Sequence, residues 1–197
     1  LRVYYIVNVY LKEINSNLPR ILSFIDLDKT NQSFGTTDRL FWGWKLKDFP
    51  NATGQGMVNG MIRLWTNDLW PYKSSKKSFL ERIYYLIEGA KYLTRNNGSL
   101  EEAFPYEGSY CVTALVAFDH LVAYELIENQ LSMEFKEKWL KTIKPWINFL
   151  INSNETHAFI SNHLATAGAA LLRWSMIDSS SSFGKKTLIS GKKIIEK

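Results

Sequence analysis

The chain has 197 residues, of which 46% are hydrophobic and 14% are aromatic. This length and composition predict one globular domain with a sizeable core. The net charge of +5 favours anionic partners, but the lysines and arginines form no dense stripe, which argues against nucleic acid as the partner.

Cysteine and histidine spacing limits the chemistry that the chain can carry. Cys111 is the only cysteine, so no intrachain disulfide can form, and its apolar neighbours indicate a small buried side chain. His120, His157 and His163 lack the spacing of a metal-binding motif. We therefore expect no metal site and no cofactor.

No segment has a signal-peptide pattern, and no apolar run looks long enough to span a bilayer. The chain begins at Leu1 rather than Met, so the missing signal says little about the compartment. Nothing in the sequence predicts an oligomeric state.

Helical periodicity dominates, and strand signals are sparse. Residues 2–25 predict one or two helices, with an interruption near residues 15–19 that includes Pro19. Residues 31–50 predict a loop rich in aromatic and charged side chains.

Beyond this loop, two kinds of predicted helix alternate. Helices of the first kind are apolar nearly all round, which indicates enclosure by neighbours, and they begin near Met57, Ser109 and Ile160. Helices of the second kind are amphipathic, and Pro145 should bend or break one of them. Their apolar stripes are Phe79, Ile83, Leu86, Ile87, Ala90 and Leu93, then Phe135, Trp139, Leu140, Ile143, Trp146, Ile147 and Leu150, and last a weaker set of Leu188, Ile189, Ile194 and Ile195.

The starts of the enclosed helices repeat at about fifty residues, and such a period is typical of repeat architectures. One enclosed and one amphipathic helix make each unit. We predict an all-α fold, an incomplete (α/α) toroid of stacked helical hairpins. Residues 1–197 would be a single helical domain, the N-terminal part of a longer toroid protein.

In such a ring, the connections that precede the inner helices share one rim, where free backbone N–H groups favour anions. The first connection, residues 38–55, offers Arg39, Trp42, Trp44, Lys45 and Gln55 as substrate ligands. Aromatic faces stack on sugar rings, and the polar groups could hold carboxylates or hydroxyls. The alternative is that the aromatic residues cap the core.

The other two connections also carry candidate residues. Residues 100–109 contain Tyr106 and Glu107, close to Tyr110, and Glu107 either caps a helix or faces substrate. Residues 157–164 bring Asn162 and His163 into the first turn of an apolar helix, with Ser161 as the expected N-cap. Buried Asn and His side chains need partners, so this pair is either a satisfied core pair or a functional one.

These segments resemble the heparinase II/III and alginate lyase group of polysaccharide lyases. Ser161-Asn162-His163, followed by an Ala-rich helix, is similar to the Asn-His segment of that group. The aromatic run from Asp38 to Gln55 and the run from Phe104 to Ser109 look like rim loops of uncharacterised bacterial members.

The resemblance implies β-elimination at uronic acid residues of an acidic polysaccharide, at the periplasm or cell surface. Asn162 matches the residue that neutralises the uronate carboxylate, and His163 matches the adjacent neutraliser or base. Charge stabilisation and positioned proton transfer are the physical basis of that chemistry. The family's catalytic Tyr, a second His and a β-sandwich have no counterpart here, so the chain is expected to be incomplete and inactive alone.

Two other functions compete with the lyase interpretation. A glycoside hydrolase on a similar ring would use two carboxylic acids, for which Asp48, Glu101, Glu102 and Glu107 are available. A non-catalytic helical module would bind glycan or protein without turnover.

Overall fold

The computed structural model describes residues 2–102, 104–156 and 159–196, with side chains from residue 9 onward. Within these ranges the chain is mostly helical, which confirms the all-α prediction. The α-helices are α1 (Arg2–Leu22), α2 (Arg39–Trp42), α3 (Met57–Thr66), α4 (Lys76–Tyr92), α5 (Tyr110–Ile127), α6 (Met133–Asn152), α7 (Ser161–Ile177) and α8 (Ser182–Ile195). The shorter elements are the 3-10 turns η1 (Thr53–Gly56) and η2 (Glu128–Gln130), and the antiparallel strands β1 (Leu100–Glu101) and β2 (Gly108–Ser109).

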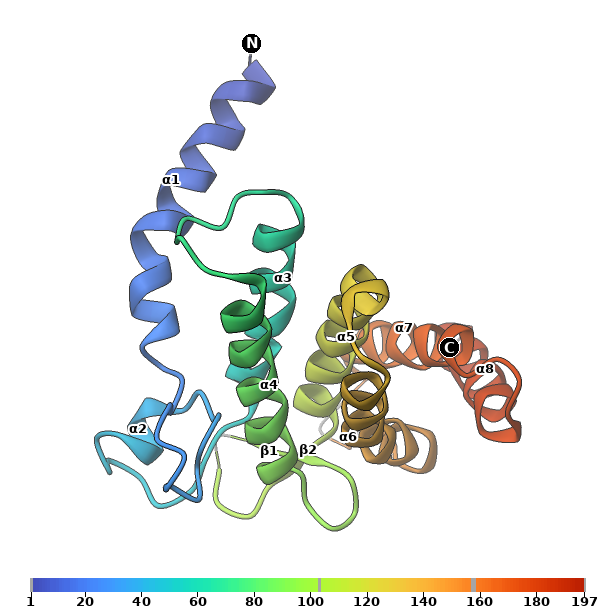
Figure 1. The fold of residues 1–197 in the computed structure, drawn as a ribbon. Coiled ribbons are helices and arrows are strands. Elements are labelled where there is room, and N and C mark those ends of the chain that lie inside the picture. Colours follow the sequence, from blue (N-terminus) through green and yellow to red (C-terminus); the bar gives the residue numbers. More distant parts are fainter. Residues whose placement is uncertain (1, 103, 157–158, 197) are drawn as a thin grey trace.

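Three successive helix pairs form the body of the molecule. Helix α5 contacts both α3 and α7, while α6 contacts α4 and α8, so the helices divide into two layers. Figure 1 shows the pairs following one another from α3–α4 through α5–α6 to α7–α8, with α1 projecting from the first pair. The predicted helix starts are confirmed to within one residue. The described residues contain these three pairs and no closed ring.

The three helices of the first layer are not equally enclosed. Helix α5 is buried on most sides, because it lies between α3 and α7 and is backed by α6. In α3 and α7 the buried residues are confined to one side, which corrects the prediction of three wholly enclosed helices.

The stripes of α4 and α6 form the core between the layers. Every predicted residue of the α4 stripe is buried, and in α6 the two tryptophans Trp139 and Trp146 are fully buried. Helix α1 runs unbroken through Pro19, so the predicted interruption near residues 15–19 is wrong, and α6 runs through Pro145 without a break. In α6, packing of Ile143 and Trp146 on either side of Pro145 offsets the missing backbone hydrogen bond.

Helix α8 turns a different face inward from the one predicted. Its buried residues are Gly184, Thr187 and Gly191, whereas Leu188 and Ile189 are exposed. A Cβ atom added to Gly191 would lie 3.2 Å from the carbonyl oxygen of Gly168 in α7. The two helices approach closely at Gly168 and Gly191, where a larger side chain would not fit.

Candidate functional site

The three connections that precede α3, α5 and α7 approach one another at one end of the helices. The backbone N–H of Ala52, in the first connection, donates to the carbonyl of Glu101 in β1, 3.0 Å away. Burial is the main cause that raises the pKa values of Tyr110 and Cys111 at the start of α5, and the charge of Glu155, just before α7, adds to both shifts. The rim expected from the sequence is therefore a shared surface in the structure.

Asn162 and His163 lie in the first turn of α7. Ile160, in an extended conformation, is the N-cap residue, and Ser161 is already helical, one position away from the expected cap. The side chain of Asn162 is exposed, and that of His163 is 21% exposed. The pair is therefore open to solvent and is not a satisfied core pair.

His163 is held by an acidic residue that the sequence did not single out. Its Nδ1 lies 2.7 Å from Oε2 of Glu155, whose side chain is only 2% exposed. The carboxylate accepts the Nδ1–H, so the neutral ring carries its lone pair on Nε2. Among the described residues, Nε2 has no hydrogen-bond partner. This is the arrangement of an oriented base whose second nitrogen can reach a substrate.

Tyr110 and Cys111 lie beside this pair. Burial, with a smaller contribution from the charge of Glu155, raises the pKa of Tyr110 to about 12. The pKa of Cys111 is also raised, by burial and then by the charges of Glu102 and Glu155. Both groups keep their protons at neutral pH, so neither is a base or a nucleophile in its resting state.

Some residues of the aromatic loop hold the fold together, whereas others are accessible to a ligand. Trp42 is structural, because its Nε1–H donates to the carbonyl of Phe24, 2.8 Å away. Trp44 is 55% exposed, and the guanidinium of Arg39 lies 5.5 Å from the centroid of its ring. The Nζ of Lys45 lies 5.9 Å from the Phe41 ring centroid.

Gln55 does not fit its predicted role in binding substrate. Its side chain is fully buried, and its Nε2 donates to the carbonyls of Gly35 at 3.1 Å and Leu86 at 2.8 Å. These two hydrogen bonds connect η1 to the loop before α2 and to α4. The sequence pattern could not separate this role from a rim role, because Gln55 stands in a run of small and polar residues.

The second connection carries the β1–β2 pair, and Phe104 and Tyr106 between the strands are exposed. Tyr106 is 88% exposed and adopts a left-handed backbone with φ of 60°. Glu107 is half-buried, and it does not cap α5: the Ser109 hydroxyl accepts from the N–H of Val112, 3.1 Å away. The structure therefore places Tyr106 on the surface and Tyr110 inside, although both lie near the rim.

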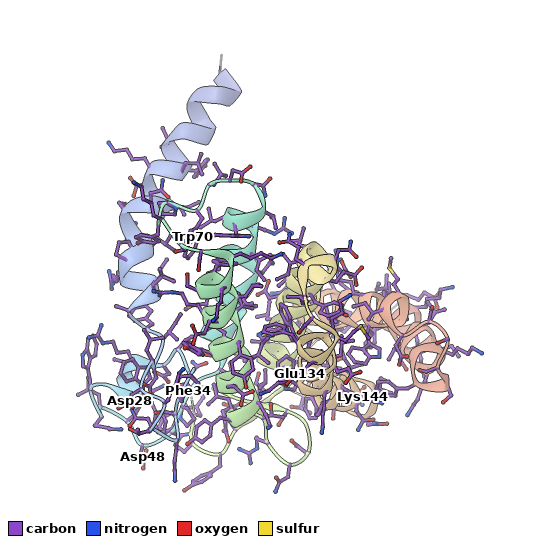
Figure 2. The ribbon with its side chains drawn as sticks, viewed as in Figure 1. Asp28, Phe34, Asp48, Trp70, Glu134 and Lys144 are labelled. Carbon is purple, nitrogen blue, oxygen red and sulfur yellow. The ribbon has the colours of Figure 1, made fainter. Side chains whose placement is uncertain are left out.

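Of the acids proposed for a hydrolase, Glu101, Glu102 and Glu107 lie on the β1–β2 hairpin, where the N–H of Glu102 donates to the carbonyl of Glu107 at 3.2 Å. Glu101 is paired with Arg95, whose Nη1 lies 3.2 Å from Oε2. Asp48 is exposed at the outer edge of the α2 loop, away from the Glu134 and Lys144 side of the molecule (Figure 2).

Asp119 of α5 is an acid that the sequence reading overlooked. Its Oδ1 accepts from Nδ2 of Asn59 at 2.8 Å, and Arg63 donates to the Asn59 side chain at 2.9 Å. Burial raises the pKa of Asp119. A helix period alone gave no reason to choose this residue, because its partners come from α3.

Across the described ranges, no group of three or more His, Cys, Asp or Glu side chains is placed to hold a metal ion. One described segment, Tyr110–Gln130, has the length and composition of a membrane span, which the sequence reading missed. Because 67% of it is buried inside the protein, it has the environment of a core helix and gives no clear membrane span. His157 of the third connection falls outside the described residues.

No family model, curated protein or solved structure matches this chain. We therefore infer its function from its own residues.

Proposed function

We propose that the chain carries part of a site that cleaves an acidic polysaccharide by β-elimination next to a uronate. The observation that carries this proposal is the orientation of His163 by the buried carboxylate of Glu155, at a solvent-accessible helix start beside the exposed Asn162. The start of α7 adds the positive end of a helix dipole, which favours a carboxylate ligand.

Each residue has a defined task in this mechanism. The Asn162 amide donates to the uronate carboxylate and stabilises the negative charge that develops when the C5 proton leaves. Nε2 of His163 takes that proton, the C4–O4 bond breaks as the C4–C5 double bond forms, and the leaving O4 oxygen takes a proton from water. Glu155 stabilises the imidazolium that results and fixes the ring orientation through Nδ1. The resemblance to heparinase II/III-like lyases and the (α/α) toroid that it implies are part of this proposal.

A glycoside hydrolase is the second candidate, and Asp119 is the observation that favours it. A carboxyl group whose pKa is raised by burial suits a general acid. The ion pair between Glu101 and Arg95 weakens the case for Glu101 as its partner. A non-catalytic glycan-binding module would use the same accessible residues without turnover.

The test is product analysis with the complete protein, incubated with polygalacturonate, alginate and heparin, and with dextran as the neutral control. We expect unsaturated products that absorb in the ultraviolet from at least one acidic polymer and none from dextran. His163→Ala should reduce the rate by about 100-fold or more, the usual range for a lost general base. Met176→Ala, at the exposed far end of α7, is the matched control and should leave the rate unchanged.

Three outcomes contradict the lyase proposal. An unchanged rate in His163→Ala removes the proposed base. Saturated products whose formation is lost in Asp119→Asn support the hydrolase. Binding of an acidic polymer without any product supports the non-catalytic module.

A further inference from the structure

A cavity with a largely apolar lining lies between the end of α1 and α2, away from the α7 site. It has a volume of about 410 Å³, and its lining includes Arg20, Ser23, Phe24, Arg39, Leu40 and Trp44. Sites for small ligands commonly occupy roughly 300–1,000 Å³. The cavity is therefore large enough for a sugar unit.

The walls of this cavity are fixed by hydrogen bonds between the two elements. Trp42 bonds the carbonyl of Phe24, and Nη1 of Arg39 donates to the Ser23 hydroxyl at 3.0 Å. On the other side, the N–H of Leu46 donates to the carbonyl of Leu40, at 2.9 Å, and closes the loop after α2. A ligand would meet a preformed wall, which lowers the entropic cost of binding.

The cavity carries excess positive charge. Asp38 lines it, but its carboxylate is paired with Lys47 and accepts the N–H of Asn51 at 2.8 Å. The guanidinium groups of Arg20 and Arg39 remain. Among the described residues, Nε and Nη2 of Arg39 have no hydrogen-bond partner, so one edge of this guanidinium can bind a carboxylate through two parallel bonds.

The indole of Trp44 supplies an apolar surface next to that charge, 5.5 Å from the Arg39 guanidinium. Gly43 keeps this arrangement open: a Cβ atom there would lie 3.0 Å from Cγ of Arg39. A planar cation beside an exposed indole fits a ring that carries a carboxylate.

We propose that this cavity binds one carboxylate-bearing sugar, with the carboxylate on Arg39 and Arg20 and the ring against Trp44. The choice of a uronate as ligand rests on the proposed function, whereas the anionic character follows from the two arginines. Figure 1 places α2 and α7 at opposite sides of the molecule, so the cavity is a separate subsite and not part of the His163 pair.

The test follows the Trp44 indole N–H by ¹⁵N NMR while digalacturonate is added to the full chain, with Trp44→Phe to assign the signal. We expect a saturable shift with digalacturonate and none with maltose. Arg39→Gln should raise the apparent Kd at least about tenfold, because it removes a charge-assisted contact. Arg82→Gln, an equal loss of charge on α4, is the matched control and should leave the Kd unchanged.

The outcomes separate this cavity from the lyase proposal. Equal Kd values for Arg39→Gln and Arg82→Gln, or an equal response to maltose, overturn the cavity site even if His163→Ala abolishes product formation. A response that depends on Arg39, persists in His163→Ala and accompanies no unsaturated product upholds the cavity and contradicts the lyase.

Discussion

Replacing Gly89 by Ala is expected to destabilise the protein by about 3 kcal/mol or more, the upper part of the range for overpacking. A Cβ atom at position 89 would lie 2.1 Å from the backbone carbon and oxygen of Gly35, and 2.5 Å from the nitrogen of Thr36. The loop cannot retreat easily, because Gly35 has a positive φ of 81° and its carbonyl accepts from buried Gln55. Urea denaturation followed by circular dichroism measures the change.

Gly60→Ala is the matched control for this prediction. Gly60 lies inside α3, and no neighbouring atom lies within 4 Å of a Cβ atom added there. Ala should therefore stabilise the helix by up to about 1 kcal/mol, because Gly is the weaker helix former. Destabilisation of equal size at both positions would contradict the close approach of α4 to the loop around Gly35.

Acid is expected to destabilise the protein through His120. Burial lowers the pKa of His120 to about 3, against a small opposing effect of the Gln55 carbonyl. Its Nδ1 accepts from Nε1 of Trp139 at 3.0 Å, so the proton lies on Nε2, 3.2 Å from that carbonyl. Below pH 6.5, His120 binds a proton in the unfolded chain but stays neutral in the folded chain until the pH falls to about 3. Stability therefore falls as pH decreases from 6.5 to about 3, by up to about 1.4 kcal/mol per pH unit.

The contribution of His120 is isolated by comparison with His120→Gln. Glutamine offers one donor and one acceptor and does not titrate, so the variant should be less stable at pH 7 but lose less stability between pH 6.5 and 5. Most carboxylates and the other histidines contribute equally to both proteins. Equal pH slopes in urea denaturation would show that His120 titrates normally and is not sealed in the core.

The elements predicted correctly are those whose apolar residues recur with a clear helical period. The α4 stripe from Phe79 to Leu93 is buried as expected, and the starts of α3, α5 and α7 follow the predicted repeat. Helix α8 shows where this reasoning fails. Its inward face depends on the small distance between Gly168 and Gly191, a tertiary fact that hydrophobic periodicity does not contain.

The candidate site was predictable only in part. Asn162 and His163 stand out in the sequence because two polar residues interrupt an apolar helix. Glu155, the partner of His163, stands eight positions before it in a connection without periodicity, so no sequence pattern links the two. Gln55 shows the reverse error, since a polar residue in an exposed-looking loop proved to be buried.

The central claim, that Asn162 and His163 meet a uronate, is tested most directly by NMR titration of the full chain with oligogalacturonate. The side-chain amide of Asn162 and the imidazole of His163 should shift in a saturable way. The fully buried His120 ring serves as the internal reference and should not move. Saturable binding that leaves Asn162 and His163 as undisturbed as His120 would contradict the claim.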